Sequence, residues 1–314
     1  MKAVRKILIT GGAGSVGKDY VGALLEKGCD VTVLDRDVEP LRSIDDNRLV
    51  LVEGSLEDRK TLQKAIEGAD AVIHLAWSFS ADTLEIFDHD LKGHIHLLDE
   101  MASRRIRHLI YTSTAVVYGK VKYSPIDEDH PLVVEEARKP LYGIAKAAAE
   151  KLCLMYSNEG KVPATIFRFW WAFGEDIAGR HLREMLKTAA AGEPLEVPGD
   201  SGGSFIHMAD LVQAMEIALM NETAFGRTFN FSTVFVTWEE VAEMVSEVTG
   251  SLAEVRVIPK EEWKGSAFLA DPWELSDTYA RDLLGYKPMD PEQAKGTLKK
   301  AISNRWEGMK KSQE

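Results

Sequence analysis

The sequence predicts an α/β protein built on a doubly wound parallel sheet, with a smaller C-terminal α/β lobe. Short apolar runs alternate with stretches of helical spacing through the first 170 residues, and this alternation is typical of β-α-β units in a parallel sheet. A glycine-rich stretch, TGGAGSVG, joins the first apolar run to the first helical stretch. After residue 170 helices mix with short strands and with Pro and Gly, which indicates a second, less regular lobe.

The order of apolar runs and helical spacing predicts the individual elements. Buried strands are expected at 4–10, 30–35, 48–54, 70–76, 106–114 and 163–169. Helices are expected at 15–28, 55–68, about 82–104 and from 141 onward. The second half is expected to hold helices at about 179–192, 208–220, 238–249 and 290–306, and a return to the sheet near 226–232.

The composition is that of an ordinary globular protein, with 45% hydrophobic and 28% charged residues. The net charge of −12 argues against a nucleic-acid partner, because binding phosphates needs a basic surface. The two cysteines, Cys29 and Cys153, lie far apart, which favours a reducing compartment. The N-terminal apolar run is too short for a membrane span and has no signal-peptide pattern. We therefore expect a cytoplasmic protein with a small-molecule partner and no membrane contact.

The glycine-rich stretch is predicted to bind a dinucleotide. Gly11, Gly14 and Gly17 lie between a strand and a helix, where glycine permits a tight turn and close approach of the backbone to a pyrophosphate. Asp35 ends the second strand, where a carboxylate accepts hydrogen bonds from ribose hydroxyls. The carboxylate also repels a 2′-phosphate, so NAD is favoured over NADP, although Arg36 follows and could bind that phosphate.

These features predict how the chain is divided. Residues 1–170 are expected to form a Rossmann-type domain that binds NAD, to which the chain returns near 205–235. Residues 171–204 and 236–314 are expected to form the smaller lobe, which binds the substrate.

The stretch LYGIAKAAAE, at 141–150, places Tyr142 and Lys146 four residues apart on one helix face. Thr114 lies near the carboxyl end of a strand, where ligands of open α/β sheets bind. Lys146 is expected to bond the nicotinamide ribose, and its charge, together with that of oxidised nicotinamide, is expected to lower the pKa of Tyr142. Tyr142 can then exchange a proton with the substrate hydroxyl during hydride transfer, while Thr114 orients the substrate oxygen.

The chain resembles the extended short-chain dehydrogenase/reductase family, the NAD-dependent epimerase/dehydratase group. The matching pieces occur in family order over nearly the whole chain: TGGAGSVG (10–17), Asp35, VIHLA (72–76), TSTAVVYG (112–119), YGIAK (142–146) and FRFWWAFG (167–174). The resemblance implies that Thr114, Tyr142 and Lys146 are catalytic. It also implies a homodimer in which the helices at 82–104 and 141–158 form a four-helix bundle. The expected cofactor residues are Gly11, Gly14, Ser15, Val16, Gly17, Asp35, Arg36, Ser55, Leu56, Leu75, Ala76, Trp77, Tyr142 and Lys146.

Two departures from the family pattern bear on the reaction and the substrate. Dehydratases and decarboxylases of the family carry acids after the active-site threonine, whereas this chain has Ala115 and Val116, which transfer no protons. Nucleotide-sugar epimerases usually carry an Asn where this chain has Trp171, and an Arg where it has Gly203–Ser204. Without that guanidinium a diphosphate loses a bidentate contact.

The residues expected to bind substrate are Phe79, Thr114, Trp170, Trp171, Arg180 and Arg183. Arg180 and Arg183 could replace the missing arginine from a nearby helix. The aromatic residues, with Trp77, predict flat walls that suit a free sugar face, an aromatic or an alicyclic substrate.

The sequence thus predicts an NAD-dependent oxidoreductase that transfers a hydride at a secondary alcohol or hemiacetal carbon of a small sugar-like or cyclic substrate. A sugar or UDP-sugar 4-epimerase and a non-enzymatic dinucleotide sensor are the alternatives. No metal is expected, because His89 and His96 stand too far apart on a helix to share an ion. These histidines and His94 are expected to face solvent or an interface. Asp90 stands where relatives often have an Asn that supports a water relay to Lys146.

Overall fold

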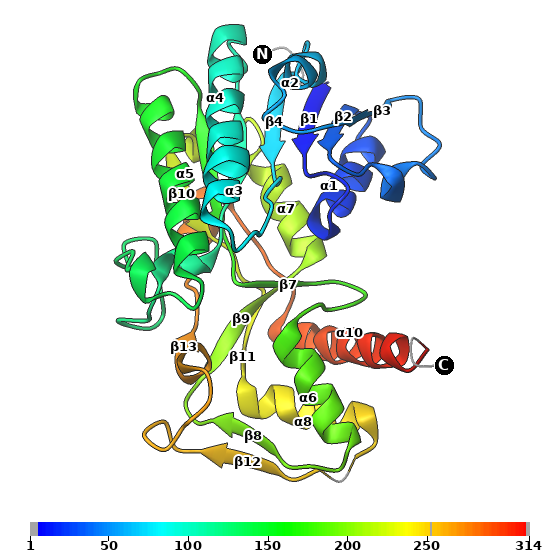
Figure 1. Ribbon diagram of the computed structural model, residues 1–314, viewed down its shortest axis with the longest axis vertical. Helices are drawn as coiled ribbons and strands as arrows, with labels where there is room; N and C mark the ends of the chain where they lie inside the picture. Colours follow the sequence, from blue (N-terminus) through cyan, green and yellow to red (C-terminus); the bar gives the residue numbers. More distant parts are fainter. Residues whose placement is uncertain (1–5, 252, 312–314) are drawn as a thin grey trace.

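The chain folds into two lobes (Figure 1), in a computed structural model that describes residues 6–251 and 253–311. The larger lobe is built on a seven-stranded sheet in the order β10-β6-β5-β4-β1-β2-β3, and all neighbouring strands are parallel. Its strands are β1 (Lys6–Thr10), β2 (Asp30–Asp35), β3 (Leu49–Glu53), β4 (Ala71–His74), β5 (Leu109–Thr112), β6 (Ala164–Arg168) and β10 (Arg227–Asn230). This arrangement confirms the predicted fold class.

Burial on both faces explains why these strands read as continuous apolar runs. In β1, Ile7 and Ile9 pack into one core cluster and Leu8 packs into another, because successive side chains of a strand point to opposite faces. The strand predicted at 4–10 is described from Lys6 onward, so its first two residues lie outside the described part of the chain.

Helices cover both faces of the sheet. The face that holds Ile7 and Ile9 is covered by α1 (Ser15–Glu26) and α7 (Met208–Ala218). The opposite face is covered by α2 (Arg59–Ala65), α4 (Lys92–Arg104) and α5 (Pro140–Asn158). The helix predicted at 55–68 begins only at Arg59, because the Asp58 side chain accepts a hydrogen bond from the backbone N–H of Lys60 and so caps it.

The helix expected at about 82–104 contains a π-helical segment. The chain forms α3 (Thr83–Glu85), then the π-helical segment η2 (Ile86–Leu91), and only then α4. Short π-helical segments occur frequently at functional sites, and Asp90 lies within this one. The helical stretch predicted at about 82–104 is therefore present, and the wider turn inside it is a feature that a 3.6-residue apolar period does not reveal.

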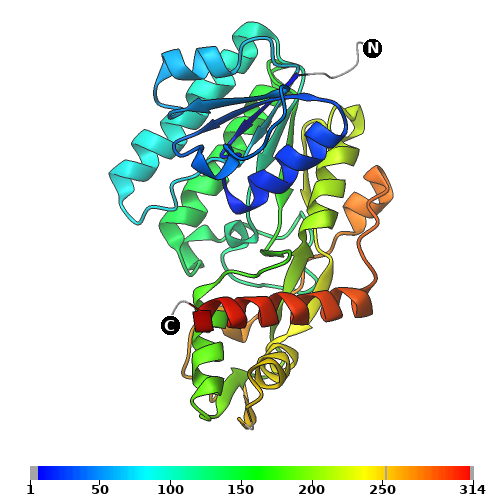
Figure 2. The same ribbon diagram turned by 90° about the vertical axis from the view of Figure 1, so that its right-hand side faces the viewer.

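The smaller lobe combines short strands with helices. A mixed sheet contains β7 (Trp171–Phe173), β9 (Gly202–His207), β11 (Val234–Thr237) and β13 (Pro272–Trp273), and a parallel pair contains β8 (Leu195–Pro198) and β12 (Val255–Ile258). Its helices are α6 (Arg180–Ala190), α8 (Trp238–Thr249) and α10 (Pro291–Lys311). Figure 2 shows α10 running across this lobe on the side that faces the larger one. The apolar faces of α6, α8 and α10 pack together in one core cluster.

The chain passes between the lobes more than once. It leaves the larger lobe after β6, returns through α7 and β10, and leaves again at β11. The predicted return near 226–232 is confirmed, since β10 pairs with β6. The remaining short elements are η1 (Glu39–Leu41), η3 (Ala115–Tyr118), η4 (Val134–Glu136), η5 (Glu222–Ala224), η6 (Ala267–Ala270) and α9 (Thr278–Leu284). Within residues 6–251 and 253–311, no helix is both long enough and apolar enough to cross a membrane.

Candidate active site

A cleft of about 340 Å³ lies at the carboxyl ends of β1, β2 and β4. The predicted cofactor residues that line it are Gly11, Gly14, Asp35, Arg36, Ser55, Leu56, Leu75, Ala76 and Trp77. Ser15, Val16 and Gly17 form the first turn of α1, immediately after the lining residue Gly14. The structure therefore brings these predicted residues together around one cleft.

The glycine loop has the shape that a dinucleotide needs. Gly11 has a φ of +72°, and a Cβ atom there would lie 2.6 Å from the backbone nitrogen of Ala76. A Cβ on Gly17 would lie 2.5 Å from the Cα of Gly12, so only glycine lets α1 sit this close to the loop. Gly14 caps α1 without a side-chain hydrogen bond, which leaves the first N–H groups of the helix for a phosphate. The residues present thus fit a bound NAD.

Asp35 is bonded to the same loop. One of its carboxylate oxygens, Oδ2, accepts a hydrogen bond of 3.0 Å from the backbone nitrogen of Ala13. The cleft beside it also carries the carboxylates of Asp37 and Glu57, against the guanidinium of Arg36. Acidic groups therefore dominate this end of the cleft.

We expect a direct binding titration to give a dissociation constant for NAD at least about ten times lower than that for NADP. The reason is repulsion between the 2′-phosphate and the carboxylate of Asp35. In Asp35→Asn the NADP affinity should rise, because Arg36 then acts without its neighbouring charge. Equal binding of the two cofactors by the unmodified protein would show that Arg36 dominates.

Lys146 lies on α5 beneath this cleft and is almost fully buried. Its Nζ donates a hydrogen bond of 2.9 Å to the carbonyl oxygen of Thr112 and lies 4.0 Å from the ring centroid of Trp77. Burial lowers the pKa of Lys146 to about 7, against the raising effect of Asp90 and Glu150. The indole of Trp77 therefore covers an ammonium group that is readily deprotonated.

Tyr142 lies one turn before Lys146, with its ring stacked on Phe79 at a centroid distance of 5.5 Å. Burial raises the pKa of Tyr142, a hydrogen bond with Thr114 lowers it, and the charge of Asp90 raises it again. Lys146 is not among the groups that shift this pKa in the chain alone, and the predicted joint effect of Lys146 and oxidised nicotinamide stays a prediction. The raised pKa keeps the phenol protonated, as a proton donor.

Thr114 precedes η3, and its Oγ1 accepts a hydrogen bond of 3.2 Å from the backbone nitrogen of Val116. The hydroxyl therefore has a fixed place beside Tyr142. Thr114 does not itself line the larger cavity described below.

Asp90 is buried in the π-helical segment and lines the cofactor cleft. It accepts hydrogen bonds from the backbone nitrogen of Ser78 at 2.8 Å and from the Ser78 hydroxyl at 2.6 Å. A carboxylate accepts both bonds, whereas an amide in its place would offer one acceptor oxygen. Asp90 thus anchors the segment that carries Trp77 and Phe79.

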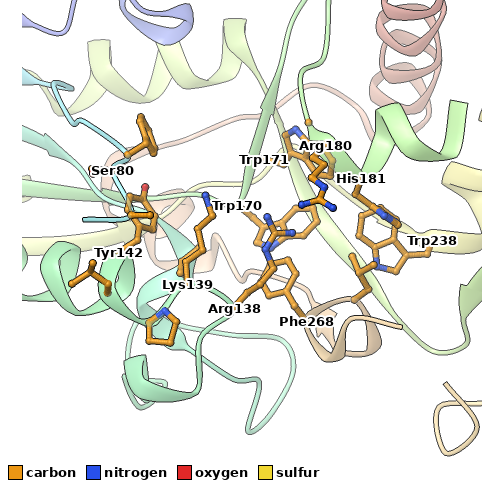
Figure 3. Close-up of a pocket in the computed structure, with 17 residues that line it drawn as sticks. Ser80, Arg138, Lys139, Tyr142, Trp170, Trp171, Arg180, His181, Trp238 and Phe268 are labelled. Atoms are coloured by element: carbon orange, nitrogen blue, oxygen red, sulfur yellow. The ribbon is translucent and has the colours of Figure 1, made fainter. Parts of the chain in front are cut away.

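A second cavity, of about 470 Å³, lies between the lobes next to Tyr142 (Figure 3). The predicted substrate residues that line it are Phe79, Trp170, Trp171 and Arg180. Arg183 does not belong to its lining and is exposed on α6. Phe79 lines both cavities, so the cofactor cleft and this cavity meet beside Tyr142.

Trp170 occupies the space next to Gly203. A Cβ atom on Gly203 would lie 2.1 Å from the Trp170 ring, so no larger side chain fits there with the ring in place. The same ring stacks on Phe268 with planes only 14° apart. Ser204 is buried, and its Oγ accepts a hydrogen bond from the backbone nitrogen of Leu275. The position where epimerases usually carry an arginine is therefore filled by aromatic carbon.

A buried ion pair lies on α5 behind Tyr142 and Lys146. Glu150, one turn after Lys146, accepts hydrogen bonds from Nε and Nη2 of Arg168, at 2.9 and 2.6 Å. Ser113 also donates to Glu150, and Nη1 of Arg168 donates to the hydroxyl of Tyr118. This network joins α5 to β6 and to the loop after β5.

The histidines are arranged differently from the prediction. His94 is buried, not solvent-facing, and its ring stacks on that of His74 at 5.1 Å. Its Nε2 contacts the carbonyl oxygen of Ala149 at 3.2 Å. His89 is half-exposed, contacts Glu57 and lines the cofactor cleft. In the part of the chain that the structure describes, no group of three or more His, Cys, Asp or Glu residues is placed to hold a metal.

Comparison with known proteins decides which family this site represents. The model of the NAD dependent epimerase/dehydratase family matches residues 7–231. The chain belongs to this family. It is similar to the UDP-glucose 4-epimerase of Lactobacillus helveticus, with 29% identity over 90% of this chain and 92% of that protein.

Two solved structures share the fold of this epimerase/dehydratase family member. One is a short-chain dehydrogenase/reductase superfamily protein from Agrobacterium tumefaciens with bound NAD, at 25% identity, a TM-score of 0.79 and coverage of 98% of this chain and 99% of that one. The other is the UDP-glucose 4-epimerase of Thermotoga maritima with UDP-glucose, at 25% identity, a TM-score of 0.75 and coverage of 98% and 100%. The predictions of the family, of an NAD-dependent enzyme and of NAD as cofactor are confirmed.

Sequence reasoning missed part of the lining of the larger cavity of this epimerase/dehydratase family member. The missed lining residues include Arg138, Lys139, His181, Trp238 and Phe268. They come from the segment before α5, from α6 and α8, and from η6. No local pattern joins them. The only available signal was their proximity in sequence to predicted residues, as for Lys139 before Tyr142 and His181 after Arg180.

Proposed function

We propose that this protein transfers a hydride between NAD and a secondary alcohol carbon of a small cyclic substrate. The observation that carries the proposal is the place of Tyr142, which lines the substrate cavity while Lys146, one turn later, reaches the cofactor side. Thr114 adds a hydroxyl next to the phenol. A dinucleotide sensor needs none of these groups in this arrangement.

Each residue has a role in moving one proton. Bound NAD supplies the hydride acceptor or donor. Tyr142 exchanges a proton with the substrate oxygen, and its protonated form suits the reductive direction. Lys146 holds the ribose side and, with a pKa of about 7, can pass a proton on at neutral pH. Trp77 and Phe79 keep water from the two groups at the junction of the cavities.

A substrate panel tests this function. NADH absorbance is followed with NAD and cyclohexanol, D-galactose, D-galacturonate or UDP-galactose. Net NADH formation that depends on Tyr142 supports the proposal. Inversion of the configuration at C4 of UDP-galactose, followed by NMR and without net formation of NADH, would instead establish the epimerase.

The nucleotide-sugar 4-epimerase is the second candidate, because the curated relatives include UDP-glucose 4-epimerases at 29% identity. Against it stands the replacement of an amide and a guanidinium, at Trp171 and at Gly203, by aromatic surface. Each lost charged contact is worth roughly 1.5–3 kcal/mol.

We therefore expect UDP to bind the NAD-loaded protein with a dissociation constant in the high micromolar range or weaker. Isothermal titration calorimetry measures this directly. Low-micromolar binding would make the epimerase the leading function. If such binding disappeared in Arg180→Gln or Arg183→Gln, the diphosphate contact would have moved to α6.

We also propose that two copies of the chain pair through α3, α4 and α5, as the family resemblance implies. Large apolar side chains are exposed on these helices and on η2, among them Leu84 at 73% and Phe87 at 49%. Ile95 on α4 and Ile144 and Met155 on α5 continue this surface. The cytoplasmic location of the protein, which is a separate matter, stays a prediction from the sequence.

Sedimentation velocity should report a dimer at micromolar concentration, and Leu84→Glu with Ile144→Glu should convert it to a monomer. Charged side chains in an apolar interface lose hydration without gaining partners. Leu283→Glu, an exposed leucine on α9, is the control and should leave the mass unchanged. A monomeric unmodified protein would contradict the pairing.

A further inference from the structure

The substrate cavity has an unusual set of polar groups for a protein of net charge −12. Three cationic side chains line it, those of Arg138, Lys139 and Arg180. No Asp, Glu, Asn or Gln belongs to the lining residues that the structure describes. Arginine and lysine donate hydrogen bonds and accept none. The cavity therefore presents mainly donors and positive charge to whatever binds there.

The cationic side chains that line the cavity come from both lobes. Arg138 precedes α5 in the larger lobe, and Arg180 begins α6 in the smaller one. In the view of Figure 3 both guanidinium groups lie between Tyr142 and Trp238. Burial lowers the pKa of His181, the charge of Glu184 raises it and the charge of Arg138 lowers it further, so Arg138 acts across the cavity on α6.

Neighbouring groups leave these cations available to a ligand. Arg138 makes a cation–π contact with Phe268, at 5.4 Å, and no ion pair with another described residue. Arg180 uses its Nε for a bond of 2.7 Å to Glu184, which does not line the cavity. The terminal nitrogens of Arg180 have no partner among the described residues and can still donate.

The walls between the cations and Tyr142 are apolar. Trp170 stacks on Phe268 at a centroid distance of 5.9 Å, and its other neighbour, Trp238, is buried behind it at the same centroid distance. Phe79 covers the Tyr142 side. A polyhydroxylated sugar would bury many hydroxyl donors against this surface with few acceptors to receive them. A ring that carries few hydroxyl groups fits such walls better.

Resting on the proposed function, we propose that the substrate is a cyclic hydroxy acid, or its oxo counterpart, whose carboxylate is held by Arg138 and Arg180. Its ring lies against the indole of Trp170, and its secondary hydroxyl faces Tyr142. A carboxylate is a planar acceptor that matches the guanidinium fork. The body of such a molecule needs no further polar partner, in contrast to a nucleotide sugar.

Calorimetry on the NAD-loaded protein tests the inference with a matched pair of probes, trans-4-hydroxycyclohexanecarboxylate and its uncharged methyl ester. The carboxylate should bind at least about ten times more tightly than the ester. D-galacturonate and UDP are titrated in parallel and should bind more weakly than the cyclohexane acid.

Three variants locate the anion. Arg138→Gln and Arg180→Gln should each weaken carboxylate binding about tenfold or more and leave ester binding unchanged. Arg183→Gln is the matched control, since Arg183 is exposed on the same helix outside the cavity, and it should change neither. Thermal melts verify that the variants remain folded.

The results separate this inference from the proposed function. Equal binding of acid and ester, no binding of either at millimolar concentration, an equal loss in Arg183→Gln, or tighter binding of UDP overturns the carboxylate site. Tyr142-dependent oxidation of a neutral alcohol together with any of these results leaves hydride transfer standing. Carboxylate binding that follows the two arginines, without any NADH from a bound hydroxy acid, supports the site and counts against the proposed reaction.

Discussion

Tyr142→Phe should lower the turnover number by a factor of about 10² to 10⁴, the usual contribution of a positioned general acid or base. The substitution removes only the phenol oxygen. The ring keeps its stacking partner Phe79, and the cofactor cleft is unchanged. The dissociation constant of NAD, measured by calorimetry, should therefore stay within about twofold.

Tyr156→Phe provides the matched control for that measurement. Tyr156 lies on the same helix, and its hydroxyl donates a hydrogen bond of 2.6 Å to Asp99, but it lines neither cavity. Its variant should turn over substrate at the normal rate. Normal turnover in Tyr142→Phe itself would remove Tyr142 from the chemistry.

Arg168→Met should lower the free energy of unfolding by about 3–5 kcal/mol, because it leaves a buried carboxylate without its ion-pair partner. The side chains of both Arg168 and Glu150 are almost completely buried. Urea titration at pH 7, followed by circular dichroism, measures the change. The variant also removes the guanidinium that donates to Tyr118, which adds to the loss.

Two further variants serve as controls for the loss of stability in Arg168→Met. The double variant Glu150→Gln with Arg168→Met should recover part of the loss, since it removes the unpaired charge. Arg256→Met breaks a pair with Glu254 in which both side chains are exposed and should cost less than about 1 kcal/mol. An equally small cost for Arg168→Met would mean that Glu150 finds water or another donor.

The sequence predicted the sheet and the cofactor site because both depend on local patterns. Strands such as β1 are buried on both faces, so their apolar runs are visible without any tertiary information. Gly11 and Gly17 have geometric requirements that only glycine meets, and Asp35 lies at a fixed distance along the chain. Tyr142 and Lys146 share one helix turn, and their spacing became informative only together with the glycine loop, Thr114 and the family resemblance.

The substrate cavity could be predicted only in part, because its lining comes from segments far apart in sequence. Trp238 and Phe268 carry no signal that separates them from ordinary core residues. The difference between Arg180, which lines the cavity, and Arg183, which does not, depends on how α6 is rotated. Sequence gives the helix but not this rotation.

Burial also changed the expected electrostatics. The prediction took Lys146 as a charged group that acts on Tyr142 together with bound oxidised nicotinamide. In the structure Trp77 and the sheet remove water from the ammonium group, and desolvation shifts the pKa values of both residues toward their neutral forms. Burial of this kind follows from tertiary packing, which local spacing does not encode.

The return of the chain to the sheet through α7 and β10 has a consequence for biosynthesis. Before these elements leave the ribosome, β6 is an unpaired edge and one face of the sheet lacks the helix that covers it beside α1. Leu211 on α7 accepts a hydrogen bond from the Tyr20 hydroxyl on α1, almost two hundred residues earlier. The nascent chain therefore has to include β7, β8 and β9 of the smaller lobe before the sheet of the larger lobe can gain its last strand.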